Sequence, residues 1–174
     1  MQKVGYLKLG TYNGGVVLML ELCGNYDIFT LPQQGEAVCV TTNGTIKQNG
    51  YAVMGKGIAL QADNLFHVSY KLGQYLETYG NRAFNLGVVT RDNIPFYLFS
   101  FPTKHHWKED SDITLICDSA QKIVEMCDKF NVQKCYLPPV GCGCGNLNWD
   151  NTVKPWLSQI LDNRFIVVLG GKQS

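Results

Sequence analysis

The clearest pattern in the chain is a stripe of apolar residues between Asp112 and Phe130. Its members recur at steps of three and four residues, which places them on one face of an α-helix. They are Ile113, Ile116, Cys117, Ala120, Ile123, Val124 and Cys127. Residues 110–112 are acidic or hydroxyl residues, which cap helix starts and favour the positive end of the helix dipole. The pattern predicts an amphipathic helix from Asp112 to Phe130.

Two other segments are expected to be helical. A helical stretch follows residues 54–57 and reaches about Tyr79. A shorter stripe near the end of the chain consists of Val153, Trp156, Leu157, Ile160 and Leu161. Its Pro155 fits in a first helical turn, because proline lacks the N–H that an interior turn needs. The last helix is therefore predicted to begin near residue 151 or 152.

Short apolar runs between these segments have the length and composition of buried β-strands. The predicted strands are Val16–Leu22, Ala37–Thr42, Phe84–Thr90, Pro95–Phe101, Lys134–Pro138 and Phe165–Leu169. The segment Arg91–Pro95 suits a hairpin turn between the third and the fourth strand. Residues 1–174 are expected to form one free-standing domain, with a short disordered tail near residues 171–174.

Strands and helices alternate through most of the chain, which predicts a three-layer α/β/α domain with a central mixed sheet. In sheets of this kind, ligands bind beyond the carboxyl ends of the strands. Three loops with unusual chemistry follow predicted strands, after Thr42, after Phe101 and after Pro138. We therefore expect these loops to meet at one edge of the sheet and to build one site.

Composition narrows the classes of function. Hydrophobic residues make up 45% of the chain, charged residues 17%, and the net charge is +1. These values are typical of a soluble globular domain and exclude a chain-wide basic field for nucleic acid, although Lys104–Lys108 is locally basic. No segment is long and apolar enough to cross a membrane, and the N-terminus lacks the apolar region of a signal peptide.

The seven cysteines favour reduced thiols in a cytoplasmic protein, because their number is odd and no export signal is visible. Most of them fall at apolar positions of predicted helices or strands, where cysteine acts as a small core residue. Cys142 and Cys144 stand too close together for a zinc knuckle, and no second pair lies at ligand spacing. No metal site is therefore expected.

Two glycine-rich loops offer backbone N–H groups with little side-chain cover, which suits a phosphate or a diphosphate beside a helix start. One consists of Gly141, Cys142, Gly143, Cys144, Gly145 and Asn146, and the other of Met54, Gly55, Lys56, Gly57 and Ile58. The second loop matches neither nucleotide-binding motif: Ser or Thr does not follow its lysine, and Leu60 replaces the third glycine of a dinucleotide fingerprint. The alternative is a glycine turn that lets a helix pack against a strand.

Five polar residues outside these loops are candidates for chemistry. Lys104 follows a strand and can hold a ligand or polarise a leaving group. His105 and His106 suit acid–base chemistry or nucleic acid contacts, but adjacent side chains point apart, so at most one is expected in the site. Asn43 can bond ribose hydroxyls, and Asp27 can accept from an adenine amino group. Each has a plainer alternative as a turn or surface residue.

Four segments, in order, resemble the motifs of the macro domain family. They are Ala37–Asn43, Val53–Leu60, Phe101–Trp107 and Leu137–Gly143, and the resemblance spans about Asp27 to Leu169. Each motif is weak alone, but four in order, each in a matching strand and loop context, are specific. Within the family, the chain is most similar to the branch of the DarG-like DNA ADP-ribosyl glycohydrolases and the terminal ADP-ribose protein glycohydrolases.

The resemblance implies an ADP-ribose-binding domain that removes ADP-ribose from a nucleic acid base or a protein side chain, without a cofactor. It implies Lys104 and Asn43 as the catalytic residues, with Asn43 near the distal ribose. The two glycine loops and Thr42 are the implied ligand contacts, with the diphosphate between the loops and the adenine facing Asp27. The implied partners are ADP-ribose and ADP-ribosylated substrates, including a nucleic acid that carries ADP-ribose, and no membrane.

One departure from the family affects the choice of function. Several members place a catalytic aspartate shortly after Gly-Cys-Gly, whereas this chain has Cys144-Gly145-Asn146 and no acid before Asp150. Three functions stay open. The first is hydrolysis through Lys104, the second is a non-catalytic module that binds or sequesters ADP-ribose or a related nucleotide, and the third is an ADP-ribose-1″-phosphate phosphatase, which the missing acid disfavours.

Overall fold

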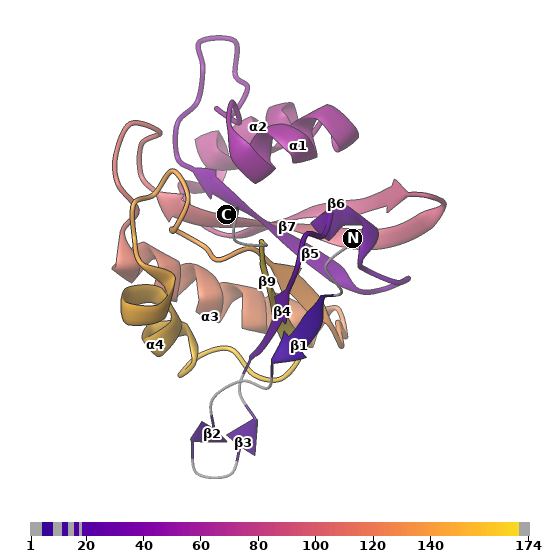
Figure 1. Cartoon of the computed structure of the whole chain (residues 1–174). Coiled ribbons are helices and arrows are strands. Elements are labelled where there is room, and N and C mark those ends of the chain that lie inside the picture. The colour runs from indigo at the N-terminus through magenta and orange to yellow at the C-terminus, as the bar shows by residue number, and fades with distance from the viewer. Residues whose placement is uncertain (1–4, 9–11, 14–15, 18, 171–174) are drawn as a thin grey trace.

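The computed structural model describes residues 5–8, 12–13, 16–17 and 19–170. They form three layers, in which a seven-stranded mixed sheet lies between helices on both faces (Figure 1). The three-layer architecture predicted from the sequence is confirmed. The tail predicted near residues 171–174 lies outside the described residues. No helix in the described ranges is long and apolar enough to span a bilayer.

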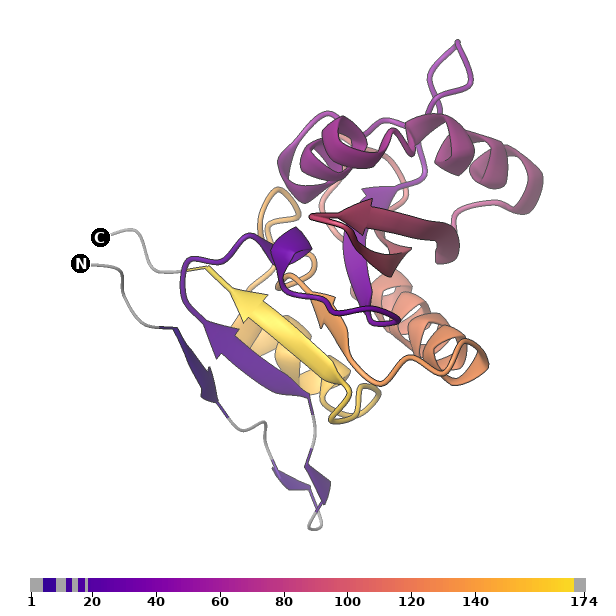
Figure 2. The ribbon, with the colours of Figure 1, turned by 90° about the vertical axis from the view of Figure 1, so that its right-hand side faces the viewer.

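The sheet is parallel in its centre and antiparallel at both edges. Its order is β1-β4-β9-β8-β5-β7-β6, and only the β1–β4 and β7–β6 pairs among the described strands of this sheet are antiparallel. The strands are β1 (Tyr6–Lys8), β4 (Leu20–Cys23), β5 (Ala37–Asn43), β6 (Phe84–Arg91), β7 (Ile94–Lys104), β8 (Cys135–Leu137) and β9 (Phe165–Leu169). A separate pair, β2 (Tyr12–Asn13) and β3 (Val16–Val17), lies beyond the ends of β1 and β4 (Figure 2).

Alternation along β5 shows how one strand serves two cores. Ala37 and Cys39 pack into the core under α3 (Ile113–Lys129), whereas Val38 and Val40 pack into the core under α1 (Gly57–Phe66) and α2 (Ser69–Tyr79). All four of these residues are fully buried. Successive side chains of a strand point to opposite faces, so a continuous apolar run is what a central strand requires.

The predicted helix after Asp112 is confirmed as α3. The Asp112 side chain caps it by accepting a hydrogen bond of 2.8 Å from the backbone N–H of Thr114. Ile116, Ala120 and Ile123 from the predicted stripe are fully buried against the sheet. The apolar period and the capping residue were sufficient to place this helix.

The single helical stretch predicted up to Tyr79 is wrong, because two helices occupy it. The helix α1 ends where His67 adopts a left-handed conformation with φ 53°. The Asp63 carboxylate then accepts a hydrogen bond of 2.9 Å from the backbone N–H of Ser69, at the start of α2. This side-chain bond replaces a helical one and turns the chain between the two helices.

Two further boundaries differ from the prediction. Instead of one strand over Val16–Leu22, the chain forms β3 and then β4, which begins at Leu20. The last helix begins earlier, as the π-helical turn η2 (Trp149–Val153), and continues as the short helix α4 (Lys154–Leu157). Lys154 of α4 forms an ion pair with the buried Glu21 of β4, which ties this helix to the sheet.

The hairpin between β6 and β7 is confirmed. Asp92 and Asn93 form its tip, and both have positive φ, 51° and 64°. These values are typical of a two-residue turn that matches the twist of the strands. The strand β7 continues to Lys104, three residues beyond the predicted end at Phe101.

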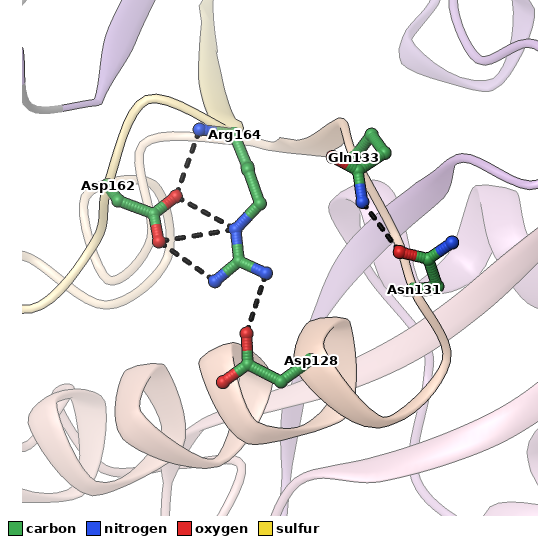
Figure 3. Close-up of polar contacts among 5 residues, drawn as sticks. All are labelled: Asp128, Asn131, Gln133, Asp162 and Arg164. Atoms are coloured by element: carbon green, nitrogen blue, oxygen red, sulfur yellow. Dashed lines mark hydrogen bonds and ion pairs between the residues drawn. The ribbon is translucent and has the colours of Figure 1, made fainter.

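Arg164 joins the segment before β9 to the end of α3 (Figure 3). Its guanidinium donates to both carboxylate oxygens of Asp162 and, at 2.7 Å, to Asp128. Burial raises the pKa of Asp162, but the bonds from Arg164 outweigh this effect, so the pKa lies below its ordinary value. A separate hydrogen bond joins Gln133 to Asn131 in the turn after α3.

Replacing this arginine should lower stability in a pH-dependent way. Arg164→Ala is expected to reduce the free energy of unfolding by about 1–2 kcal/mol at pH 7, because it removes hydrogen bonds between charged groups. A lowered Asp162 pKa stabilises the fold above about pH 4 and loses its effect as the pH falls further. Urea unfolding should therefore show a difference from wild type that shrinks below about pH 4. The exposed Arg82→Ala is the control, and an equal loss in both variants would contradict the assignment.

Candidate functional site

One cavity of about 500 Å³ lies at the carboxyl ends of β5, β7 and β8, beside the start of α1. This volume is within the range of small-molecule sites. The loops that follow these three strands therefore meet at one edge of the sheet. The predicted site residues that line the cavity are Thr42, Asn43, Met54, Gly55, Lys56, Gly57, Ile58, Lys104, Gly141, Gly143, Cys144 and Gly145.

The start of α1 faces this cavity with bare backbone. Gly57, the first residue of the helix, has φ 57°, a conformation that side chains rarely adopt. A Cβ on Gly55 or Gly57 would meet nothing within 4 Å, so no side chain covers the backbone there. The first N–H groups of a helix have no partner within the helix and favour an anion.

The loop Gly141–Asn146 is held against the start of α3. A Cβ on Gly145 would lie 2.0 Å from the hydroxyl oxygen of Ser111, so only glycine fits this approach. The backbone N–H of Ser111 donates to the carbonyl of Gly145 at 3.0 Å, and Asn146 donates to the carboxylate of Asp110 at 2.7 Å. These contacts fix one wall of the cavity.

Lys104 lies where the strands and the glycine loop meet. It is half-buried, and its ammonium group donates to the carbonyl of Cys144 at 2.8 Å. Lys104 is also the strand partner of Asn43, because a register shift after Thr42 leaves Thr103 unpaired between β5 and β7. Bulges of this kind redirect side chains near binding sites. The shift thus brings the two predicted catalytic residues side by side.

Asn43 already makes two hydrogen bonds. Its amide nitrogen donates to the carbonyl of Val53 at 3.0 Å, and its amide oxygen accepts from the backbone N–H of Thr45 at 2.9 Å. Each amide atom retains capacity for one more bond. Asn43 therefore holds the next loop in place and still faces the cavity.

The two histidines do not line the cavity. The imidazole Nε2 of His105 is hydrogen-bonded to the Asp112 carboxylate at 2.9 Å, and this bond lowers the pKa of that carboxyl. His106 stacks on Trp107 with ring centroids 6.0 Å apart. Trp107 lines the cavity and is 44% exposed. Of the three residues that follow Lys104, only Trp107 therefore contributes a side chain to the cavity.

Asp27 lines a neighbouring cavity of about 750 Å³, which shares Gly57, Ile58 and Pro138 with the first. Its carboxylate accepts from the backbone N–H of Phe29 at 3.0 Å and from Arg91 at 2.9 Å. The first bond begins the short helix η1 (Ile28–Thr30). We call these two adjoining cavities the cleft, and Asp27 lies in the second of them with Arg91 as its partner.

Two predicted ligand residues fall outside the cavity lining. Asn146 is turned toward Asp110, as described above. The Cys142 thiol donates to the carbonyl of Val140 at 3.3 Å. Burial, followed by the charge of Asp150, raises the pKa of this thiol to about 11, so it stays protonated at neutral pH and is no nucleophile.

The first cavity is electropositive. Lys56 and Lys104 line it, whereas its described lining residues include no carboxylate and no imidazole. Among the described residues, no group of three or more His, Cys, Asp or Glu is arranged to hold a metal ion. The arrangement therefore offers lysine ammonium groups and backbone N–H groups to an anion.

Sequence reasoning missed several lining residues, which are Thr41, Val53, Ala59, Thr103, Ser111, Pro138 and Pro139. Thr103 lines the cavity because of the register shift between β5 and β7, and Ser111 does so because it lies close to Gly145. Neither event has a local pattern in the sequence. The prolines, by contrast, stand directly before the predicted glycine loop and could have been included on that ground.

No family model matches the chain, but individual proteins do. The DNA ADP-ribosyl glycohydrolase of Thermus aquaticus is 32% identical over 119 residues, which cover 66% of this chain and 32% of that protein. The DNA ADP-ribosyl glycohydrolase of Mycobacterium tuberculosis is 30% identical over 107 residues, covering 59% and 30%. The chain thus spans about a third of the length of these curated relatives.

Solved structures show the same relationship over more of the chain. The macrodomain of Thermus aquaticus DarG matches with a TM-score of 0.65 and 26% identity, covering 87% of this chain and 98% of that one. The macrodomain of Mycobacterium tuberculosis DarG gives 0.65 and 25%, covering 83% and 94%. Thermosipho africanus DarTG in complex with ADP-ribose gives 0.68 and 25%, covering 86% and 41%. The chain belongs to the macro domain family, and within it the chain is similar to the macrodomains of the DarG proteins.

Proposed function

We propose that this domain is an ADP-ribosyl glycohydrolase that removes ADP-ribose from a modified nucleic acid base. The position of Lys104 carries the proposal, because its ammonium group lies where β5, β7 and the glycine loop meet. The names of the similar proteins support DNA as the nucleic acid. A neighbour in the structural comparison was solved with ADP-ribose, which supports that ligand.

The cleft suggests how ADP-ribose would bind. The diphosphate would lie between the start of α1 and the loop Gly143–Gly145, where bare N–H groups and Lys56 complement its charge. The adenosine would extend into the neighbouring cavity toward Asp27, and the distal ribose toward Asn43. Asp27 would then have to exchange its bond with Arg91 for the adenine or share it.

Lys104 would act on the bond between the distal ribose and the base. Hydrolysis breaks this bond, the oxygen of water joins the anomeric carbon, and the base leaves with a proton. An ammonium group can donate that proton or stabilise charge on the leaving base. In the present arrangement one of its three N–H donors bonds to the carbonyl of Cys144, and the other two are available to the substrate.

The second candidate is a module that binds ADP-ribose without cleaving it. It is favoured by the absence of a carboxylate or an imidazole among the described lining residues, which leaves lysine as the acid–base group. The phosphatase has less support, because the loop after Gly143 supplies no acid before Asp150.

We also propose a cytoplasmic location and a single domain over residues 1–174. The location is supported by the seven cysteines, all of which are free thiols, as expected in a reducing compartment. The single domain is supported by the one sheet that runs from β1 to β9 and by helices on both of its faces.

Removing the ammonium group tests the catalytic proposal. Lys104→Ala should lower the release of ADP-ribose from an ADP-ribosylated DNA oligonucleotide by about 100-fold or more, the usual contribution of a general acid. Calorimetry should show that the variant still binds ADP-ribose. The matched control is Lys134→Ala, which removes an exposed lysine outside the cavity lining and should keep wild-type rates.

The outcomes separate the candidates. Unchanged release by Lys104→Ala would contradict the proposed role of Lys104. If wild type binds ADP-ribose but releases it neither from DNA nor from an ADP-ribosylated peptide, the binding module is correct. Phosphate release from ADP-ribose-1″-phosphate would identify the phosphatase, and no binding at all would refute the shared premise.

Thiol labelling tests where the ligand lies. Cys144 is exposed and lines the cavity, whereas the Cys142 thiol is held protonated by its raised pKa. Iodoacetamide at pH 7.5 should therefore alkylate Cys144 before Cys142, since the thiolate is the reactive form. Saturating ADP-ribose should slow labelling of Cys144 but not of Cys117, which lies on α3 outside the linings of both cavities. Mass spectrometry of peptides measures both rates, and labelling of Cys144 that ignores ADP-ribose would place the ligand elsewhere.

A further inference from the structure

A further cavity, of about 440 Å³, lies at the β6 edge of the sheet, between the ends of α2 and α3. We call it the edge groove. Four aromatic residues, among them Tyr75, Tyr79 and Phe84, and three cationic residues, Arg82, Lys122 and Lys129, dominate its lining. None of them takes part in the ADP-ribose cleft described above.

The aromatic residues form one cluster on the surface. The ring centroids of Tyr75 and Phe84 are 5.2 Å apart, those of Tyr79 and Phe84 6.1 Å, and those of Tyr75 and Tyr79 6.3 Å. Tyr79 is nevertheless 61% exposed, so it contributes a ring face to solvent rather than to the core. Such exposed rings are stacking surfaces for unpaired bases.

The charges of the groove favour an anionic partner. Arg82 and Lys129 are exposed, and Lys122 is paired at 3.0 Å with Glu125, the one carboxylate among the described lining residues. The groove lining has three cationic residues and one carboxylate. The whole chain has a net charge of only +1, so this excess of positive charge is a local feature of the groove. Phosphates of a nucleic acid strand complement this arrangement.

The groove is connected to the catalytic end of the cleft. Asn81 donates a hydrogen bond of 2.9 Å to the backbone carbonyl of Lys104, and the next residue, Arg82, lines the groove. The groove therefore lies on the side of β7 next to the end that carries Lys104, and a strand whose modified base is held at Lys104 could extend toward it.

We propose that the edge groove binds the single-stranded nucleic acid that flanks the modified base. Bases stack on Tyr79 and its neighbours, and phosphates contact Arg82 and Lys129. The inference rests on the proposed glycohydrolase function for its biological meaning, although the binding can be measured without it.

An alternative occupant of this edge would be a β-strand of a partner protein that pairs with β6. The strand β6 is poorly suited to such pairing. The pairing of β6 is irregular between Asn85 and Val88, and Lys71 covers the edge by donating to the carbonyl of Leu86 at 3.0 Å. Bulges and lysines are the means by which edge strands avoid pairing with another chain. The side chains of the groove, rather than the backbone of β6, are thus the recognition elements.

Binding of an unmodified oligonucleotide tests the proposal. The probe is a fluorescein-labelled single-stranded DNA of about 12 nucleotides, a length within the range of known single-strand sites, followed by fluorescence anisotropy at several salt concentrations. Tyr79→Ala should weaken binding about tenfold through lost stacking. Arg82→Ala with Lys129→Ala should weaken it and lower the slope of log affinity against log salt by about 0.7 for each cation removed.

Matched controls lie away from the groove. Tyr6→Ala removes an exposed tyrosine of β1 at the opposite edge of the sheet, and Lys134→Ala removes an exposed lysine before β8. Both should bind as wild type does, and circular dichroism melts should show that all variants fold. Groove variants that bind like the controls would overturn the proposal, as would a preference for a peptide over the oligonucleotide.

Activity separates this inference from the proposed function. On an ADP-ribosylated oligonucleotide the groove variants should raise KM about tenfold with kcat unchanged. On an ADP-ribosylated dinucleotide, which is too short to reach the groove, they should match wild type. If wild type cleaves neither substrate but loses oligonucleotide binding in the groove variants, the glycohydrolase proposal fails while the groove stands.

Discussion

The parallel register of β5 with β7 is the constraint on which the site depends. It makes Lys104 the partner of Asn43 after the irregularity at Thr42, and it brings both strand ends to the edge where the loop after β8 begins. A slip by one residue would send alternate side chains to the wrong face of the sheet. Since both faces of β5 are buried in separate cores, the apolar side chains fix this register, and the position of Lys104 follows from packing.

The loop Gly141–Asn146 completes the site because it is held from two directions. The start of α3 holds it through Ser111 and Asp110, and Lys104 holds it through the carbonyl of Cys144. This arrangement excludes carboxylates from the described lining and leaves lysines and backbone N–H groups. An anion would therefore meet groups that already point inward, which reduces the cost of ordering them on binding.

The sequence predicted those parts of the fold that depend on local patterns. The helix α3 has both a stripe and a capping residue, and β5 is a continuous apolar run. The break at His67 could not be predicted, because it depends on a left-handed residue and on the reach of Asp63 to Ser69. The site follows the same division. The glycine-rich loops can be recognised from their composition. Ser111 reaches the site only because the fold brings it close to Gly145, and no spacing in the sequence indicates this contact.

A structure of the protein with ADP-ribose would test the central claim, that the cleft between the start of α1 and the glycine loop is an ADP-ribose site ending at Lys104. We expect the diphosphate between Gly57 and Gly143–Gly145, the adenine near Asp27, and the anomeric carbon of the distal ribose within reach of the Lys104 ammonium group. A diphosphate bound outside these loops, or a distal ribose turned away from Lys104, would contradict it.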